Sequence, residues 1–542
     1  MDGNINNLKS IEKKELLSLF RKKINTQSVI SKEFLNNLSE VHNTINKNIN
    51  LVVNHRGKID LIFIGEIWEV EDYISLKFGD KNVGNSKRLI TISNRKNEFQ
   101  KNEKVSLINS KFLNYLLIRR LKNNSNLFSI CYKNIEKKDG NFWKVDSFND
   151  INTLNEDSLW AFSESSKGKK KEMKHNKLNE KVYLVGVSIQ NKKELNSSMQ
   201  ELIELSSSLG KEVVGSDVQI KKAYDSKTLV GKGFLSDVLL EAEYNDASKI
   251  IFNKELLPFQ SKEISKLTYM DVSDRTELIL EIFKKNAESK EAHIQIELAR
   301  LKYELPRIAG SGKNFSQIGG GISSKGPGEK KIEQRRRYLR KRIGLLEKQI
   351  NALSYRRMQN RSKREKNELF SATLIGYTCA GKSTLFNKLT KSNVLESTKP
   401  FSTLNPTTRR TYLSDKTEIL LSDTVGFITD LPEDLISSFR ATLEEINQSD
   451  LLIHIVDCST KDFEEKILSV EDTLIRTKLI DHKRIIIFNK IDLVSSETLD
   501  YIRMKYQQPC VSSLTNDGIN EVRAEIEKII KSSVKNQKIA NL

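Results

Sequence analysis

The 542-residue sequence contains few cysteines and no long apolar segment. Its four cysteines, Cys131, Cys379, Cys458 and Cys510, lie far apart and form neither the paired spacing of a zinc site nor a disulfide framework. This usage suits a reducing compartment. No stretch approaches the roughly 20 apolar residues that a membrane-spanning helix needs, and the N-terminus lacks the layout of a signal peptide. The sequence therefore predicts a cytoplasmic protein without a membrane span.

Acidic residues are scarce relative to basic ones. Lysine and arginine number 90 against 71 aspartates and glutamates, which gives a net charge of +19 and a pI near 9.4. A partner that is a polyanion explains this excess, and so does the lysine bias of an AT-rich genome. The location of the charge along the chain is therefore more informative than its sum.

The chain is too long for one hydrophobic core and changes composition several times. We predict an extra N-terminal α+β domain, a lysine-rich linker, a small α/β domain, a helical hairpin, a second α/β domain and a C-terminal tail. The N-terminal domain is predicted at 1–162, the linker at 163–181 and the small α/β domain at 182–290. The hairpin follows at 291–365, the second α/β domain at 366–531 and the tail at 532–542. In the first domain, "NLVVNHRGKIDLIFIGEIWEV" alternates apolar and polar residues around the turn "HRGK", which predicts a β-hairpin.

Two long amphipathic patterns predict an antiparallel coiled-coil hairpin. "EAHIQIELARLKYELPRIAG" and "GEKKIEQRRRYLRKRIGLLEKQINAL" each carry one narrow apolar seam at heptad-like steps. Between them, residues 310–328 contain seven of the 24 glycines, so this segment is predicted to be a non-helical, mobile tip.

Strand and helix patterns alternate again from about residue 366. The apolar runs "LFSATLIG", "TEILLSD", "DLLIHIVD", "KRIIIFN" and "PCVS" are separated by amphipathic stretches. This alternation predicts a doubly wound parallel β-sheet with helices on both faces.

The first of these strands leads into a complete phosphate-binding loop, G-x-x-x-x-G-K-[ST]. We expect its backbone amides to surround the phosphates, Lys382 to reach the β- and γ-phosphates and Ser383 to bind Mg²⁺. The residues assigned to this loop are Gly376, Tyr377, Thr378, Cys379, Ala380, Gly381, Lys382, Ser383 and Thr384.

Three further motifs follow in order, each at the end of a predicted strand. Asp423-Thr424-Val425-Gly426 is expected to hold Mg²⁺ through water and to contact the γ-phosphate through the Gly426 amide. In "NKID", Asp492 can accept two hydrogen bonds that guanine offers and adenine does not, beside Asn489 and Lys490. Ser512, Ser513 and Leu514 are expected to present backbone N–H groups to the guanine oxygen. The set predicts GTP over ATP.

The motifs "GYTCAGKSTLFN", "FSTLNPTTRR", "LSDTVGFITDLPEDLISSFRATLEEI" and "NKID" resemble those of the translational GTPase family HflX. The resemblance extends upstream through "LVGKGFLSDV", "DVSDRTELILEIF", "IQIELARLKYELPR" and "GGGISSKGPGEKKIEQRRRYLRKRI", and so covers about residues 180–530. The N-terminal domain is similar, more loosely, to the extra domain of that family's long forms.

The resemblance implies a monomeric GTPase that is stimulated by the large (50S) ribosomal subunit. It implies binding near the peptidyl-transferase region, splitting of stalled or idle 70S ribosomes and, in some members, displacement of antibiotics. It also places a switch segment beside the nucleotide, in which Thr403 completes the Mg²⁺ coordination and Thr407 or Thr408 is the alternative. The residues of that segment are Phe401, Ser402, Thr403, Leu404 and Asn405. On this basis Lys382, Thr403 and Gly426 are the predicted catalytic residues.

The basic runs "RRRYLRKR" and "RRMQNRSKR" concentrate positive charge on the second helix of the hairpin. This density suits phosphate contacts on rRNA, although a solvent-exposed basic helix face would give the same pattern. The candidate contacts are Arg335, Arg336, Arg337 and Arg340 on the helix and Lys313 and Lys325 in the tip. Two other functions remain open: a large-subunit assembly GTPase of the Obg-like type, and an RNA-binding protein with a structural nucleotide site.

Two positions depart from common GTPase patterns. Phe427 occupies the place where many small GTPases keep a water-orienting glutamine, so we expect slow hydrolysis without a partner. Cys379 stands where the family usually has an asparagine that helps to bind a monovalent cation. Because sulfur is a poor ligand for K⁺, the sequence predicts Mg²⁺ as cofactor and little or no stimulation by K⁺.

Overall fold

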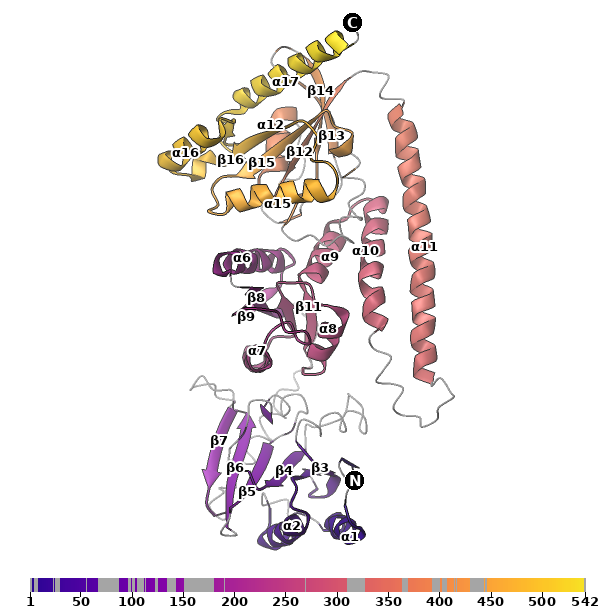
Figure 1. Ribbon diagram of the computed structural model, residues 1–542, viewed down its shortest axis with the longest axis vertical. Helices are drawn as coiled ribbons and strands as arrows, with labels where there is room; N and C mark the ends of the chain where they lie inside the picture. Colours follow the sequence, from indigo (N-terminus) through magenta and orange to yellow (C-terminus); the bar gives the residue numbers. More distant parts are fainter. Residues whose placement is uncertain are drawn as a thin grey trace.

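A computed structural model shows three folded units that follow one another along the longest axis, with one long helix beside the upper two (Figure 1). We refer to them as the N-terminal domain, the middle domain and the C-terminal domain. The structure describes residues 2–3, 8–22, 24, 30–54, 56–66, 87–95, 99, 103–104, 112, 114–121, 125–133, 143–150, 180–189, 191–268, 270–309, 327–362, 369–391, 400–401, 407–413, 415, 417–428, 443 and 446–540.

The N-terminal domain is a seven-stranded mixed sheet with two helices on one face. The strand order is β1-β3-β2-β4-β5-β6-β7, and the antiparallel pairing of β2 with β3 confirms the predicted hairpin. The helices α1 and α2 pack on one face through residues such as Leu16 and Leu38, whereas Leu240 of the middle domain packs near the other face. The elements are β1 (Asp2–Gly3), α1 (Ser10–Leu19), α2 (Lys32–Ile45), β2 (Ile49–Val53), β3 (Ile59–Ile64), β4 (Arg88–Ser93), β5 (Asn114–Arg120), β6 (Asn126–Lys133) and β7 (Trp143–Phe148).

The middle domain is a small parallel α/β sheet of strand order β11-β10-β8-β9. Helices α6 and α9 cover the face of the sheet that is turned toward the C-terminal domain (Figure 1). Helix α7 packs against the opposite face. The elements are β8 (Lys181–Ile189), α6 (Lys192–Ser208), β9 (Glu212–Lys221), α7 (Lys232–Tyr244), β10 (Lys249–Phe252), α8 (Pro258–Ser265), β11 (Asp271–Asp274) and α9 (Arg275–Asn286).

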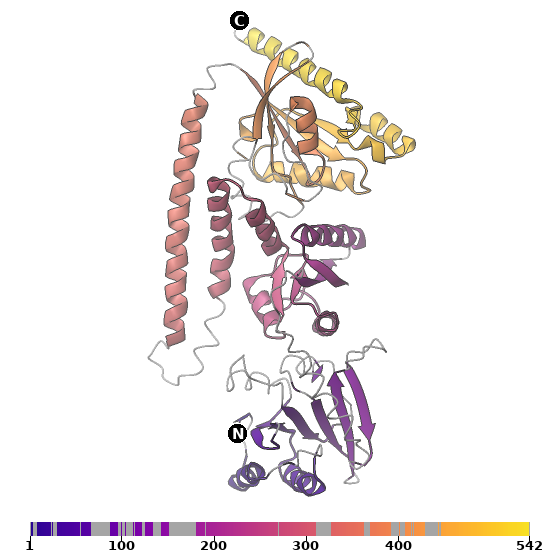
Figure 2. The same ribbon diagram turned by 180° about the vertical axis from the view of Figure 1, so that it is seen from behind.

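Two long helices, α10 (Lys290–Ala309) and α11 (Pro327–Ser362), form a hairpin. The two helices lie side by side in both views (Figures 1 and 2). Their described seam contains three buried residues, Leu298, Leu346 and Ile350. Ion pairs border it: Arg342 Nε lies 2.9 Å from Glu297 Oε1, and Arg335 NH2 lies 2.6 Å from Glu304 Oε1. Because the partner's number falls as the number on α11 rises, the two helices are antiparallel, as predicted.

The C-terminal domain is a six-stranded sheet of order β13-β14-β12-β15-β16-β17 with helices on both faces. Helices α12 and α17 pack on one face, and α15 and α16 on the other. All five predicted strands form and pair in parallel. The elements are β12 (Phe370–Gly376), α12 (Lys382–Thr390), β13 (Thr407–Tyr412), β14 (Glu418–Asp423), β15 (Leu451–Asp457), α15 (Phe463–Arg476), β16 (Arg484–Asn489), η7 (Ile491–Leu493), α16 (Ser496–Tyr506), β17 (Cys510–Val511) and α17 (Ile519–Ala540).

One strand differs from the prediction of a purely parallel sheet. Strand β13 pairs antiparallel with β14 at the edge, and the Leu413 N–H donates to the Thr417 carbonyl, 3.0 Å away, at the turn. A connection this short can only return the chain as a hairpin, because a parallel neighbour needs a crossover of a dozen or more residues. The sequence of β13, TTRRTY, is polar and lacks the apolar run by which the other strands were predicted.

Candidate functional site

The predicted phosphate loop lies at the carboxyl end of the central strand β12, and α12 begins directly after it at Lys382. The Lys382 ammonium donates to the carbonyls of Tyr377, at 2.7 Å, and Gly376, at 3.2 Å. Burial lowers the pKa of Lys382 to about 8, and the Asp423 carboxylate opposes that shift. The lysine is thus held inside the loop, next to the amino end of a helix, where phosphate groups are stabilised.

Two glycines are required by close approaches around the loop. A Cβ on Gly381, which has φ +90°, would lie 2.2 Å from Asn489 Nδ2. A Cβ on Gly426 would lie 2.8 Å from the Thr378 Cα and 2.9 Å from the Lys382 Nζ. Any side chain at residue 426 would therefore displace the loop or its lysine, which places the predicted γ-phosphate contact directly beside the lysine.

Ser383 and Asp423 provide a set of oxygen donors beside Lys382. The Ser383 hydroxyl donates to Asp423 Oδ2 at 2.7 Å, and Asp423 is fully buried at the end of β14. Hard oxygen donors of this kind suit Mg²⁺. Among the described residues there is no group of three or more histidine, cysteine or acidic side chains that could hold a metal ion. A magnesium ion would therefore need oxygens from a bound nucleotide as well.

The predicted guanine-binding residues divide into two roles. Asn489 donates from Nδ2 to the Ala380 carbonyl, 2.8 Å away, and its Oδ1 accepts from the Ser513 amide at 3.0 Å. It therefore ties the phosphate loop to the segment after β17. The Lys490 ammonium lies 2.6 Å from Asp457 Oδ2, and the Asp492 side chain is exposed.

The segment 512–514 has fewer free amides than the sequence suggested. The Ser512 amide donates to the Asp517 carbonyl at 3.0 Å, and that of Ser513 donates to Asn489. Of the three predicted donors, only Leu514, which is 75% exposed, has an amide outside these two hydrogen bonds. Leu514 is therefore the strongest candidate donor to the guanine oxygen in this segment, and the roles of Ser512 and Ser513 stay predictions.

Several predicted nucleotide-binding residues also make contacts that stabilise the fold. The Thr424 hydroxyl donates to the Leu374 carbonyl at 2.6 Å, and Val425 is buried. The Thr408 and Ser422 hydroxyls lie 2.8 Å apart on paired strands. Thr408, one of the two alternatives for the switch threonine, therefore has its hydroxyl in a hydrogen bond within the sheet. Ser402, Thr403, Leu404 and Asn405 lie outside the described residues, as do Lys313 and Lys325.

Cys379 has an unusual backbone conformation, with φ +61°. This left-handed region favours glycine and asparagine, so the cysteine stands in a strained position of the loop. Burial raises the pKa of its thiol, and the nearby Lys382 and Lys490 only partly oppose that effect. The thiol is therefore less acidic than an ordinary cysteine, which argues against a reactive thiolate at this position.

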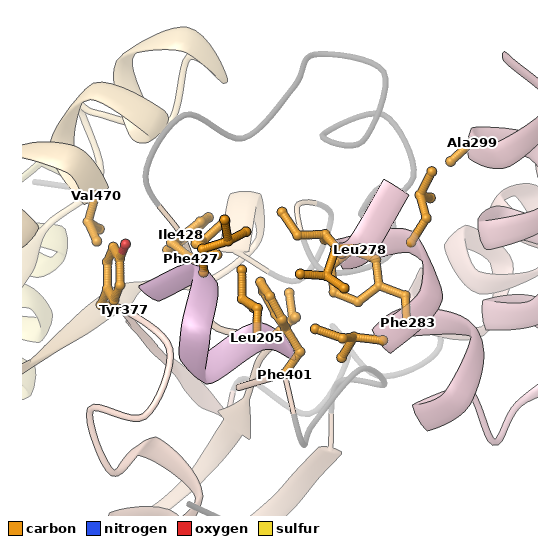
Figure 3. Packing of buried hydrophobic residues seen from close by; sticks show 14 of the residues in the cluster. Leu205, Leu278, Phe283, Ala299, Tyr377, Phe401, Phe427, Ile428 and Val470 are labelled. Carbon is orange, nitrogen blue, oxygen red and sulfur yellow. The ribbon is translucent and has the colours of Figure 1, made fainter. Parts of the chain in front are cut away.

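The sequence did not indicate that the nucleotide-facing loops belong to an apolar core shared with the middle domain. Phe427 is 6% exposed, and its backbone pairs with the phosphate loop: the Thr378 amide donates to the Phe427 carbonyl at 2.8 Å. The Phe401 ring meets that of Phe283 on α9 edge to face, with centroids 4.7 Å apart. Figure 3 shows Leu205 of α6 gathered with Phe283, Phe401 and Phe427 between the two domains.

A polar network continues this contact at the phosphate loop. The Tyr377 hydroxyl donates to Glu201 Oε1 on α6 at 2.7 Å, and Glu201 Oε2 pairs with Arg275 NH2 at 2.9 Å. Burial raises the pKa of Glu201, while Arg275 and Tyr377 oppose the shift. Nearby, Asn286 Nδ2 donates to the Phe401 carbonyl at 2.9 Å. The middle domain thus bonds to both the phosphate loop and the start of the switch segment.

The basic candidates on α11 are not equivalent. Arg335 pairs with Glu304 of α10, and Arg336 and Arg337 lie near Glu333 one turn away. Arg340 has no ion pair among the described residues. Since exposed ion pairs contribute little to stability, the three paired arginines can still exchange their partners for phosphate groups.

The fold and this site define a P-loop nucleotide-binding domain of the GTPase type, joined to an α/β domain and a helical hairpin. Three family models match the chain: "GTP-binding GTPase N-terminal" at residues 196–284, "GTP-binding GTPase Middle Region" at 286–364 and "50S ribosome-binding GTPase" at 371–490. The GTPase HflX of Alkalihalophilus pseudofirmus is 39% identical over 358 residues, which cover 65% of this chain and 83% of the relative. The chain belongs to the HflX family of GTPases.

A second HflX relative agrees with this placement. The GTPase HflX of Caldanaerobacter subterraneus is 42% identical over 308 residues, which cover 57% of this chain and 72% of the relative. A solved GTP-binding protein of Sulfolobus solfataricus in complex with GDP is 24% identical with a TM-score of 0.35, covering 65% of this chain and 99% of that one. Among the described helices, none is long and apolar enough to cross a membrane.

Proposed function

We propose that this chain is a cytoplasmic, monomeric GTP-hydrolysing factor that binds the large ribosomal subunit and splits stalled or idle 70S ribosomes. The observation that carries the proposal is the preformed site of Lys382, Ser383 and Asp423, which is packed on the same middle domain that holds a basic hairpin. A nucleotide site in contact with an RNA-binding arm is the arrangement that such a factor needs.

In this proposal the loop 376–383 binds the phosphates through its backbone amides and Lys382. Asp492 accepts two hydrogen bonds from guanine, and the Leu514 amide donates to the guanine oxygen. Asn489 acts indirectly, because its bonds to Ala380 and Ser513 hold the phosphate and guanine halves of the site in register. Adenine would leave the Asp492 carboxylate without donors, which is a strong basis for discrimination.

The cofactor in this proposal is Mg²⁺, held by Ser383 and Thr403 and, through water, by Asp423. The ion offsets negative charge on the β- and γ-phosphates. We expect K⁺ and Na⁺ to support similar hydrolysis rates, because the Cys379 sulfur is a poor K⁺ ligand. Cys379→Asn is the matched variant: it suits the same left-handed backbone and should create a preference for K⁺ in the same assay. A large K⁺ preference in the unaltered chain would contradict this role of Cys379.

Hydrolysis in this proposal depends on a partner. The Phe427 side chain lies in the core between the domains, so it neither polarises nor orients the attacking water. Positioning and electrostatics carry phosphoryl transfer, and this chain supplies Lys382 and the Gly426 amide for the γ-phosphate, with Thr403 as the proposed switch residue. We therefore propose that the bound large subunit orders the switch segment and accelerates turnover.

The hairpin in this proposal reaches rRNA near the peptidyl-transferase region. The candidate contacts are Arg335, Arg336, Arg337, Arg340, Lys313 and Lys325. A glycine-rich tip at that place would also lie where antibiotics bind, which supports a role in antibiotic resistance. Neutralising phosphates releases counterions, so binding should weaken steeply as the salt concentration rises.

Sedimentation of 70S ribosomes through sucrose gradients tests the proposal. With the chain and a non-hydrolysable GTP analogue, 70S particles should convert to free subunits, and Lys382→Ala should abolish the conversion. If 70S particles persist while the chain co-sediments with immature large subunits, an assembly GTPase of the Obg-like type is the better account. If subunits bind but saturating amounts never stimulate hydrolysis, the nucleotide site is structural.

A further inference from the structure

Helix α11 carries a second regular stripe on the side that faces away from α10. It consists of Tyr338, Lys341, Leu345, Lys348, Ala352 and Tyr355. These residues follow one another at steps of three and four, which places them along one face of a helix. They lie opposite the buried side of the same helix, which carries Leu339, Leu346 and Ile350. The stripe runs from residue 338 to residue 355, a rise of about 25 Å at 1.5 Å per residue.

Three large side chains on this stripe are exposed to solvent. Tyr338 is 66% exposed, Tyr355 is 57% exposed, and Leu345 between them is 46% exposed. None of the hydrogen bonds or ring contacts of the described residues uses the Tyr338 or Tyr355 ring or hydroxyl. Two tyrosines and a leucine on one solvent-facing stripe of a helix already packed on its other side indicate an interaction surface.

The charge around the stripe indicates the chemistry of the partner. Residues 333–355 contain seven lysines and arginines and two glutamates. Arg335, Arg336, Arg337 and Arg342 have carboxylate neighbours. Lys341 and Lys348 on the stripe, and Arg340 beside it, have no ion pair among the described residues. Within residues 333–355, the positive charge without an ion pair therefore lies on and beside the stripe that carries the tyrosines.

A protein helix is a poor occupant of this surface. Lys341 and Lys348 lie between the apolar residues of the stripe. A partner helix in a coiled coil would have to bury both lysines. A nucleic acid needs both kinds of side chain: lysines for phosphates, and aromatic rings on which unpaired bases stack. The hydroxyl group of each tyrosine can remain hydrated at the edge of such a contact.

We propose that this stripe of α11 is an RNA-binding surface, on which Tyr338 and Tyr355 stack against unpaired bases while Lys341 and Lys348 contact phosphates. The surface is separate from the arginines proposed for rRNA contact and from the tip. It rests on the proposed function to the extent that the RNA is the rRNA of the large subunit. The spacing of the two rings requires unpaired bases about 25 Å apart, as in two loops or bulges of a folded RNA.

The test compares the full chain with two double variants. Replacing Tyr338 and Tyr355 by alanine should weaken binding to purified large subunits by roughly 10-fold or more. Replacing both by phenylalanine should retain affinity within about 2-fold, because the stacking faces remain. Binding of a fluorescent GDP analogue should be the same in all three proteins, which excludes misfolding as the cause.

The charge contribution has a separate test. Lys341→Gln together with Lys348→Gln should weaken subunit binding and reduce the slope of log affinity against log salt concentration by about 1 to 2. If the unaltered chain fails to bind subunits, the proposed function fails. If it binds and the double alanine variant binds equally well, the stripe is not an RNA-binding surface. If a protein from the subunit cross-links at residue 338 or 355 and rRNA does not, the partner is a protein and the proposal is overturned.

Discussion

The core between the middle and C-terminal domains and the seam between the two hairpin helices are built by contrasting means. The first of these contacts, between the domains, is the larger one. Toward the C-terminal domain the middle domain offers a broad apolar core that includes Phe283, Phe401 and Phe427. The hairpin is closed by a narrow seam of three buried residues, flanked by exposed ion pairs. The apolar core contains the loops that adjoin the nucleotide, whereas the hairpin carries the proposed RNA contacts. Helix α10 belongs to that core through Ala292 and Ile296, so the difference suggests that nucleotide state acts on the core and that α11 is the adjustable part of the hairpin.

The largest effect should come from removing an aromatic ring from the core between the domains. Phe283→Ala deletes the ring that contacts Phe401 and should destabilise the middle domain by about 3–5 kcal/mol. If the switch segment loses only about 1.4 kcal/mol of this stabilisation, the affinity for the nucleotide falls by a factor of about 10. We therefore expect release of a fluorescent GDP analogue to be about tenfold faster.

Phe252→Ala is the matched control for this change. Phe252 is fully buried in the other core of the same domain, so the cavity has similar size but no contact with the switch segment. Equal acceleration of GDP release by both variants would show that general loosening, and not the shared core, controls the nucleotide.

A buried histidine should make the stability of the C-terminal domain depend on pH. His454 on β15 is 1% exposed, and its Nδ1 has no hydrogen-bond partner among the described residues. Burial, Arg484 and Lys382 lower the pKa of His454 to about 3. The folded state therefore keeps this side chain neutral where the unfolded chain binds a proton. The stability that results is present above about pH 6.5 and is lost as the pH falls toward 3, at about 1.4 kcal/mol per pH unit.

Between pH 6.5 and 5.0 the C-terminal domain should lose about 2 kcal/mol from this source. Hydrogen exchange of the β15 amides, corrected for the intrinsic rate at each pH, measures it. His454→Leu should flatten the pH dependence. His293→Leu, which changes an exposed histidine of the hairpin, should leave it as it was. A pH dependence that survives His454→Leu would assign the effect to other groups.

Much of the nucleotide site followed from the sequence because its motifs are local. Lys382, Ser383 and Asp423 meet because parallel strands end at one edge of a sheet. The structural role of Asn489 did not follow, since its hydrogen bonds to the backbone of residues 380 and 513 join segments that are far apart in the sequence. The Tyr377–Glu201 hydrogen bond joins residues 176 positions apart in two domains. No periodicity or spacing indicates such a contact, because it depends on how the domains pack.

The smallest effect should come from the ion pairs of the hairpin. Glu297→Arg places like charges opposite each other at Arg342, and Arg342→Glu does the same with the signs reversed. Each single change should open the hairpin slightly and increase proteolysis of α11 at low salt, since exposed pairs contribute little. The double exchange restores opposite charges and should restore protection.

GDP release should be the same in all three hairpin variants. A change there would show that the hairpin, and not only the core between the domains, restrains the nucleotide. High salt should reduce the differences between the variants, because screening removes the repulsion of exposed charges.

The central claim is that this chain is a GTPase that needs the large ribosomal subunit for fast turnover, because Phe427 is buried between domains where it cannot orient water. Phosphate release from GTP, measured with the chain alone and with increasing concentrations of purified large subunits, tests it most directly. The account predicts slow release from the chain alone and a saturable increase of at least about tenfold with subunits. Groups supplied by partners reach about 10³–10⁵-fold in other GTPases, so tenfold is a lower bound. A rate that is fast without subunits, or that does not change when they are added, would contradict it.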